Sequence, residues 1–214
     1  MQRRDFISLI GMTALTSGCS NSAAFKTINS AFDSSFGNPS SFDPDYPDRL
    51  PYASIAVKTG NSPKALLVLG KSEADELHWQ SADKALLVTQ NGILVRTAGF
   101  RENLIRTTHI DSTKLSSGKR QRIIDLSPSR HYGVRIDLEL VATRTEEIQI
   151  GHRTYITSRY SEYGTSKLLR WNFVNEYWQD ESGFIWRSTQ YFHPQHPPLT
   201  IEITKPFLPD KTNT

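Results

Sequence analysis

Cysteine is almost missing from this sequence, because Cys19 is the only one among 214 residues. A single cysteine cannot form an internal disulfide, so its thiol is free, paired with another chain, or modified. Long apolar runs are missing as well. The apolar stretch near the N-terminus, Phe6 to Leu15, is far shorter than the roughly 20 residues that span a bilayer. These two absences exclude a disulfide-stapled domain and an N-terminal membrane-spanning helix.

Residues 1–18 have the composition of an export signal. Arg3 and Arg4 supply positive charge, the short apolar stretch follows, and Ser17-Gly18 provides the small residues that a signal peptidase requires. Arg3, Arg4 and Phe6 also fit a twin-arginine export motif. An ordinary Sec signal carries the same arginine pair, so both export routes stay open.

Cys19 stands directly after this signal. Leu15 to Cys19 resembles a lipobox, in which the cysteine sulfur takes a diacylglyceryl group before cleavage, although Thr16 replaces the usual branched apolar residue. Cys19 is therefore the predicted lipid attachment residue. Ser20, rather than aspartate, favours transfer to the outer membrane, so we expect a lipid-anchored protein that faces the periplasm.

The mature chain has little excess charge. The sequence holds 25 basic and 22 acidic side chains, and cleavage before Cys19 removes Arg3, Arg4 and Asp5, which leaves a net charge of +2. This balance argues against nucleic acid as a partner and against a polybasic membrane contact. We expect the protein to contact the membrane through its lipid anchor instead.

Residues 19–49 are predicted to form a lipidated tether, a short helix and a linker. Apolar side chains recur at steps of three and four residues, which is typical of one short amphipathic helix, and these are Phe25, Ile28, Phe32 and Phe36. Such a helix could dock on the domain or bind a partner. Gly37 to Arg49 is rich in proline and serine, which predicts no regular structure there.

Residues 50–214 are predicted to form a single, mainly β domain. Asn91-Gly92 separates the apolar runs Ala85–Thr89 and Ile93–Thr97, and this pattern indicates a hairpin with a type I′ turn. Further strands are expected at Tyr52–Lys58, Ala65–Leu69, Val134–Leu140, Glu147–Ile150, Thr154–Ser158, Leu168–Trp178, Phe184–Phe192 and Leu199–Thr204. The fold class is an antiparallel meander, closed as a barrel or flattened as a sandwich.

One long segment lacks this pattern. Asn103 to Arg130 is the least regular part of the domain. Within it, Lys119, Arg120 and Arg122 form a basic cluster that is most simply explained as a solvated loop.

Catalytic motifs are missing from the sequence. It has no Gly-x-Ser-x-Gly elbow, no His-Glu-x-x-His and no glycine-rich phosphate loop. His193 and His196 are close in sequence, but they lack an obvious third metal ligand. Neighbouring carboxylates such as Asp180-Glu181 do not form a recognisable acid–base pair. No catalytic residue, metal or cofactor is therefore predicted.

Aromatic residues gather in the C-terminal half, mostly with the alternation of a buried strand face. Trp178 has the opposite parity and stands beside a turn. Together with Trp186 and Arg187, it is the candidate contact for a glycan or a protein partner.

A set of short stretches carries a resemblance to a known family, and they are Leu50–Ile55, Trp79–Asp83, Leu87–Thr89, Asn91-Gly92, Arg96–Gly99, Asn175–Trp178, Ser182–Ser188, Gln190, Pro197–Leu199 and Ile201–Pro206. Together they resemble the group 4 capsule polysaccharide lipoproteins of the YjbF/GfcB type. Members of that family often carry proline in the turn after Trp178, where this chain has Asp180-Glu181-Ser182. The resemblance implies an outer-membrane lipoprotein of mostly β fold, encoded beside exopolysaccharide or capsule machinery, with no established catalytic residue.

Four functions compete at this point. The favoured one is a non-enzymatic accessory factor for secretion or assembly of capsule or exopolysaccharide, which binds the export proteins or the polymer. The first alternative is a carbohydrate-binding module with a groove lined by Trp178. The second is a periplasmic enzyme acting on polysaccharide through Asp180, Glu181 or His193. The third is a lipid or lipoprotein carrier, which requires a large apolar cavity.

The lipid anchor can be tested by replacing Cys19. Because acyl chains would supply most of the membrane affinity, Cys19→Ser should leave a folded protein in the soluble periplasmic fraction. Immunoblotting of membrane and soluble fractions after a high-salt wash measures this, with Ser20→Ala as the matched control that stays in the membrane. Retention of the Cys19→Ser protein in washed membranes would rule the anchor out.

Overall fold

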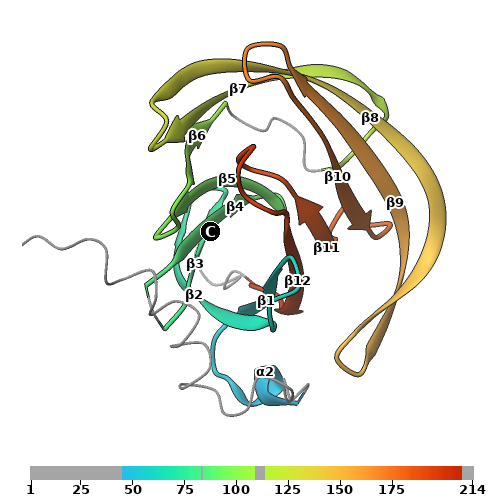
Figure 1. Cartoon of the computed structure of the whole chain (residues 1–214). Coiled ribbons are helices and arrows are strands. Elements are labelled where there is room, and N and C mark those ends of the chain that lie inside the picture. Colours follow the sequence, from blue (N-terminus) through green and yellow to red (C-terminus); the bar gives the residue numbers. More distant parts are fainter. Residues whose placement is uncertain (1–44, 83, 109–113, 209–214) are drawn as a thin grey trace, which may run out of the picture.

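The computed structural model describes residues 45–82, 84–108 and 114–208 (Figure 1). These residues form one short helix, α2 (Tyr46–Arg49), and twelve strands. The strands are β1 (Ser54–Thr59), β2 (Ala65–Glu73), β3 (Glu76–Gln80), β4 (Leu86–Gln90), β5 (Ile93–Ala98), β6 (Asn103–Thr107), β7 (Gly118–Ser127), β8 (His131–Ile150), β9 (Arg153–Ser166), β10 (Trp171–Gln179), β11 (Ile185–Gln190) and β12 (Leu199–Lys205). None of the helices in the described part of the chain is long and apolar enough to cross a bilayer.

All twelve strands belong to one antiparallel sheet in which neighbours in sequence are neighbours in space. The exception is the pairing of the first and last strands, where Val57 lies opposite Ile201. This pairing places both ends of the meander in the middle of the sheet and leaves β5 and β6 as its edges. The sheet then curls so that these two edges meet (Figure 1).

Side chains bridge the seam between β5 and β6. The backbone N–H of Leu104 donates to the Thr97 hydroxyl at 3.0 Å, and Asn103 binds the backbone N–H and C=O of Phe100 in the connecting turn. Such side-chain bonds satisfy edge groups that would otherwise invite pairing with another chain. The fold is therefore a nearly closed barrel, which decides between the two shapes that the sequence allowed.

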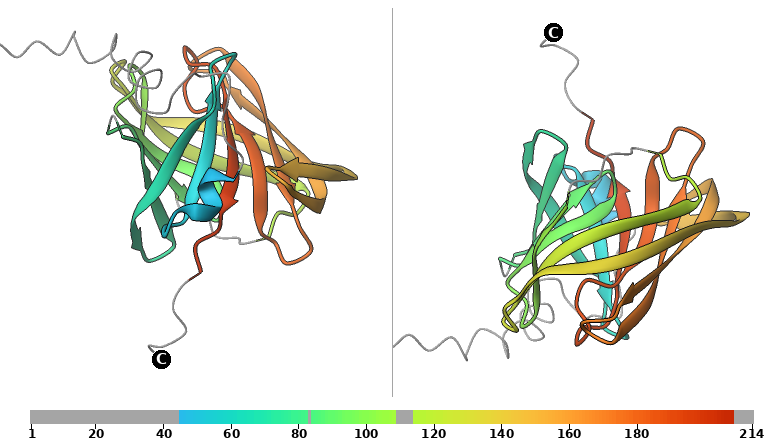
Figure 2. Two further views of the ribbon diagram at one scale, coloured as in Figure 1. Left: turned by 90° about the horizontal axis from the view of Figure 1, so that it is seen from below. Right: turned by 90° about the horizontal axis from the view of Figure 1, so that it is seen from above.

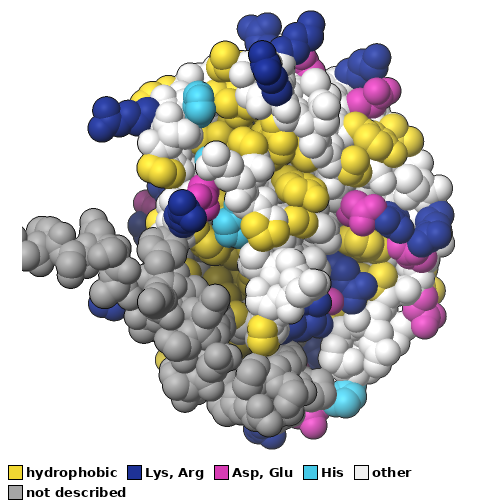
Figure 3. All heavy atoms as spheres, in the orientation of Figure 1, with side chains coloured by type: hydrophobic (Ala, Val, Ile, Leu, Met, Phe, Trp, Pro, Cys, Tyr) yellow, Lys and Arg dark blue, Asp and Glu magenta, His cyan; other side chains and the backbone are white. Residues whose placement is uncertain are grey.

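The barrel interior is filled with apolar side chains from both halves of the sheet. One continuous cluster joins Ile55, Val57, Leu67, Trp79, Leu87, Leu94, Leu104, Ile124, Leu126, Val134, Ile136, Leu138, Trp171, Phe192, Leu199 and Ile201. Charged side chains lie mostly around the periphery of the molecule (Figure 3). Alternation of apolar and polar residues along each strand produces this division, because successive side chains point to opposite faces.

The prediction of a solvated loop at Lys119, Arg120 and Arg122, inside the irregular segment Asn103 to Arg130, was wrong. The segment holds β6 and β7, and β7 pairs along its length with β8. Arg122 is also not a solvated residue, since its side chain is only 11% exposed. The apolar pattern missed β7 because two of its inward-facing positions, Arg120 and Arg122, are arginines rather than apolar residues.

β8 is one strand of 20 residues, where the sequence pattern predicted two separate ones. A bulge between Ala142 and Arg144 shifts the register but does not interrupt the pairing with β9. Residues 141–145 around the bulge are exposed, and Thr143, Arg144 and Thr145 among them are polar, which resembles a turn in sequence. A bulge keeps the ladder while bending the strand, so the β8–β9 hairpin is long and strongly curved (Figure 1).

The helix α2 lies in the segment that was predicted to lack regular structure. Pro47 stands in its first turn, where proline costs nothing because that backbone N–H has no helical partner. The prediction, from proline content, that this segment has no regular structure was therefore wrong for Tyr46–Arg49. The amphipathic helix expected around Phe25 to Phe36 lies outside the described residues.

The hairpin expected at Asn91-Gly92 is confirmed. Both residues have positive φ, +51° and +78°, as a type I′ turn requires. A Cβ atom on Gly92 would lie 2.8 Å from the Cβ of Ile185, at the start of β11. This turn is therefore pressed against the opposite wall of the barrel, and only glycine fits there.

Gly92→Ala should lower the free energy of unfolding by more than backbone strain alone explains. The strained φ costs about 1–2 kcal/mol, and overlap with Ile185 adds about 1–3 kcal/mol. Gly133→Ala is the matched control, because Gly133 also has positive φ (+64°) but no atom within 4 Å of the added methyl group. Urea unfolding compares the two, and equal losses would contradict the close approach.

Candidate functional site

The predicted export and anchor residues, Arg3, Arg4, Phe6 and Cys19, lie outside the described residues and stay predictions. The predicted contact residues, Trp178, Trp186 and Arg187, lie within the barrel wall on β10 and β11. Each of them is held by a defined set of neighbours.

Trp178 is only 8% exposed. Its indole N–H donates to the Glu146 carboxylate, and the guanidinium groups of Arg159 and Arg187 lie over its ring at 5.3 and 5.8 Å from the ring centre. The bond from Trp178, aided by Arg144 and Arg159, holds the pKa of Glu146 below its usual value. A sugar ring could not stack on Trp178 in this arrangement.

A small apolar cluster surrounds Trp178 on the side of the sheet away from Tyr177. Ile148 and Ile150, at the C-terminal end of β8, pack on Trp178, and Tyr155 and Trp186 complete the cluster. Trp186 is half-buried and stacks on Tyr155 with ring centres 3.9 Å apart. Of the predicted aromatic contacts, Trp186 is thus the more accessible, and its role as a contact stays a prediction.

Asp180 organises the turn between β10 and β11. Its carboxylate accepts bonds from the backbone N–H groups of Ser182 and Phe184, from the Ser182 hydroxyl and from the Trp186 indole. Burial alone would raise the pKa of Asp180, but these donors outweigh it and lower the pKa. A carboxylate engaged in this way acts as a structural cap on the turn.

Arg187 connects three parts of the barrel wall. Its guanidinium donates to Glu202 on β12 at 2.9 Å and to the backbone carbonyl of Gln149 at 2.6 Å. Glu202 also accepts from Lys64. The candidate contact residues are brought together, but their polar groups already bind other parts of the barrel.

The most deeply buried charge in the described residues belongs to Glu162 on β9, which has 0% exposure. Arg122 on β7 donates to it at 3.2 Å, Tyr177 on β10 donates its hydroxyl at 3.2 Å, and Asn175 donates its amide at 2.9 Å. Asn175 in turn accepts the backbone N–H of Tyr191 at 2.7 Å. Both carboxylate oxygens therefore have partners, as a buried charge requires.

Tyr177 and Arg122, the titratable donors of this network, both have raised pKa values. Burial, followed by the charge of Glu162, raises the pKa of the Tyr177 hydroxyl far above its ordinary value. Burial alone would lower the pKa of Arg122, but Glu162 and Tyr177 raise it. Neither group can exchange a proton near neutral pH, so the network suits a structural role better than acid–base catalysis.

His193 and His196, like Asp180, are engaged structurally, whereas Glu181 is exposed on the turn between β10 and β11. His193 is 2% exposed, its Nδ1 accepts the backbone N–H of Gln195, and burial lowers its pKa. The ring of His196 packs against Phe192 with centres 4.5 Å apart. Within the described ranges, no group of three His, Cys, Asp or Glu side chains is arranged to hold a metal ion.

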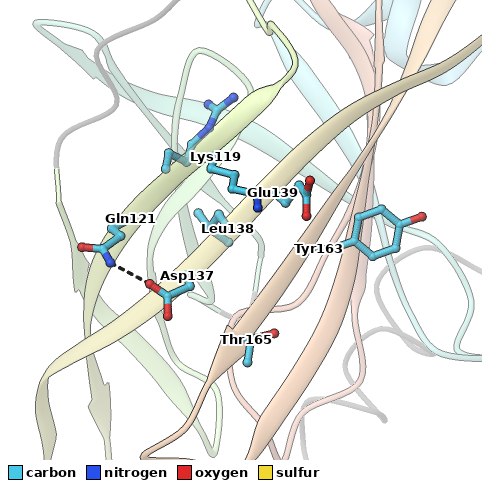
Figure 4. A pocket seen from close by; sticks show the side chains of 8 residues that line it. Lys119, Gln121, Asp137, Leu138, Glu139, Tyr163 and Thr165 are labelled. Carbon is cyan, nitrogen blue, oxygen red and sulfur yellow. Dashed lines mark hydrogen bonds between the residues drawn. The ribbon is translucent and has the colours of Figure 1, made fainter.

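A polar hollow lies on the face of β7, β8 and β9 opposite the core (Figure 4). Its volume is about 670 Å³. Strand register arranges its side chains in two rows: Lys119, Glu139 and Tyr163 are neighbours in one, and Gln121, Asp137 and Thr165 in the other. The Gln121 amide donates to Asp137 at 2.7 Å, and Tyr163 is 50% exposed.

The sequence interpretation missed both this polar hollow and the buried network, because both depend on β7. Alternation over residues 118–126 was the available signal. Lys119, Gln121 and Ile123 face out, whereas Arg120, Arg122 and Ile124 are more buried. Charged residues at inward positions concealed that alternation.

Removing the charge of Glu162 should destabilise the barrel strongly. Glu162→Gln leaves the Arg122 guanidinium buried without its anion, a change that costs about 3–5 kcal/mol. The double variant Glu162→Gln with Arg122→Met should recover much of this loss, because the orphaned charge is removed as well. Urea unfolding measures both, and a double variant as unstable as the single one would contradict the proposed pairing.

Comparison with known proteins gives a consistent result. A family model described as "Group 4 capsule polysaccharide lipoprotein gfcB, YjbF" matches residues 25–204. The chain is 28% identical to the uncharacterized lipoprotein YjbF of Escherichia coli (strain K12), over 92% of this chain and 96% of that one. It is 25% identical to the uncharacterized lipoprotein GfcB of the same organism, over 73% and 78%.

A solved structure shares the fold. The crystal structure of the hypothetical lipoprotein YmcC from Escherichia coli (K12) superposes with a TM-score of 0.70 at 22% identity, covering 89% of this chain and 100% of that one. Since the family model spans most of the sequence and the barrel matches a lipoprotein of known structure, the chain belongs to the family of group 4 capsule polysaccharide lipoproteins that includes YjbF and GfcB.

Proposed function

We propose that this protein is a non-enzymatic accessory factor for the secretion or assembly of capsule or exopolysaccharide, tethered to the outer membrane by lipid on Cys19 and facing the periplasm. The observation that carries the proposal is that the most deeply buried carboxylate among the described residues, Glu162, finds all its partners inside the barrel. Glu162, Arg122, Tyr177 and Asn175 bind one another. This buried network is therefore structural, whereas the polar hollow on the outer face of β7 to β9 is open to a ligand, which suits contact rather than catalysis.

The polar hollow on β7 to β9 is the surface that best fits the polymer. An exposed aromatic ring offers an apolar face and a hydroxyl, as Tyr163 does. Carboxylates and amides beside it, from Asp137, Glu139 and Gln121, can accept and donate to sugar hydroxyls. Together, Tyr163 and these three polar side chains favour the binding of a hydroxyl-rich ligand.

Charge at the hollow also distinguishes a glycan from other partners. Among the outward-facing side chains, Lys119 stands beside Asp137 and Glu139, so this lining carries one positive and two negative charges. The centres of protein–protein interfaces are depleted in charged residues, and nucleic-acid sites are strongly positive. Neither of these two charge arguments excludes a polysaccharide chain. Tethering keeps the surface concentrated where the polymer emerges.

A deletion strain complemented with single variants tests the function and the surface together. Loss of the gene should reduce surface polysaccharide, and the unaltered gene should restore it. Tyr163→Ala should restore it several-fold less well, since one exposed stacking ring is lost while the core is untouched. Extracted surface polymer, measured per cell, is the readout.

Tyr132→Ala is the matched control, because Tyr132 is 66% exposed but does not line the polar hollow. It should complement fully. Unchanged polymer in the deletion strain, under conditions in which the protein is expressed, would overturn the accessory role. Full complementation by Tyr163→Ala would remove the hollow as the contact surface and leave the accessory role standing.

A further inference from the structure

A second hollow of different character lies at one end of the barrel. Its volume is about 540 Å³, and it is bounded by the β2–β3 hairpin, the β4–β5 turn, the β10–β11 turn and the end of β12. The β2–β3 hairpin and the β10–β11 turn project at the same end as the C-terminal segment (Figure 2). We call this hollow the mouth pocket.

Apolar side chains form most of the walls of the mouth pocket, and its uncharged polar lining residues are Ser72, Thr89, Asn91 and Ser182. Leu77, Phe184, Ile203 and Phe207 line it and are only half-buried, so they present uncovered hydrocarbon to the hollow. Asp75 is its only charged lining residue in the described part of the chain, and it lies exposed on the hairpin turn. A hollow of about 300–1,000 Å³ with mostly apolar walls and few polar groups has the character of a ligand site.

Tight packing closes the base of the pocket. Trp79 is 1% exposed and fixed by its indole bond to Thr89 at 2.9 Å. Gly92 lies against Ile185 so closely that a methyl group would not fit between them. The pocket therefore ends at the barrel core and opens only outward.

The Phe184 wall is held in place before any ligand arrives. Asp180 accepts the backbone N–H of Phe184 at 3.0 Å, and the Phe184 ring meets Trp186 edge-on with centres 4.7 Å apart. A preformed wall reduces the ordering cost of binding. The pocket is thus a built feature rather than a gap between mobile loops.

We propose that the mouth pocket binds an acyl chain. Uncharged hydrocarbon is the chemistry that complements apolar walls, a closed base and a single charge at the rim. The chain could come from two sources, the protein's own lipidated cysteine or a lipid of the bilayer beside it. This inference does not depend on the role in polysaccharide secretion.

Photocrosslinking in cells tests the inference on the full lipidated protein. Cells are fed a palmitic acid analogue with a diazirine on its chain and a terminal alkyne, then irradiated, and crosslinked peptides of the purified protein are mapped by mass spectrometry. Crosslinks should concentrate on peptides carrying Leu77, Phe184 and Phe207. Equal labelling of peptides carrying Ile156 and Leu168, which are each 71% exposed, would show only general membrane contact and overturn the proposal.

Two neighbouring substitutions separate the pocket from the rest of the hairpin. Ser72 is the cross-strand partner of Leu77 and lines the pocket, whereas Lys71 is paired with His78 and does not. Ser72→Phe should fill the pocket and reduce its crosslinks at least five-fold, and Lys71→Phe should leave them unchanged. Circular dichroism confirms that both variants fold, and crosslinks insensitive to Ser72→Phe would contradict the assignment.

The crosslinked species identifies the source of the chain. A pocket peptide joined to the peptide of Cys19 indicates that the protein binds its own acyl group. A pocket peptide joined to a phospholipid indicates a bilayer lipid. Each result supports an acyl-chain site, whereas a pocket that yields no crosslinked peptide overturns it.

Discussion

The buried carboxylate of Glu162 constrains the curvature of the sheet from β7 to β11. A charge inside a protein must be matched by opposite charge and hydrogen-bond donors, or it costs several kcal/mol. Its partners come from β7 and β10, on either side of its own strand β9, and Asn175 extends the network to Tyr191 after β11. Five consecutive strands from β7 to β11 must therefore curl around one point, which favours a closed barrel over a flat sheet.

The sequence predicted the parts of this barrel that rest on local chemistry. Asn91-Gly92 specified its turn because few other residues adopt positive φ at both positions. β7 was missed because the charge pairing that makes Arg122 an interior residue involves Glu162, 40 positions away. The bulge in β8 was missed for a similar reason, since its polar residues are kept in the strand by β9 and not by their own preference.

The same limit explains how far the candidate contact site could be predicted. Parity along β10 correctly separates Trp178 from Tyr177, which is completely buried. Alternation along the strand could not show that the C-terminal half of β8 supplies Ile148 and Ile150, which cover Trp178. A face that points away from one core can still be buried by a long hairpin, so alternation gives the direction of a side chain but not its exposure.

The turn between β10 and β11 contacts both the Trp178 cluster and the mouth pocket. Asp180 binds the indole of Trp186, which stacks beside the Trp178 cluster, and also the backbone of Phe184, which forms a wall of the mouth pocket. Interior packing transmits displacement because it has few voids. A change at one end of this turn must therefore be accommodated at the other, through a single carboxylate.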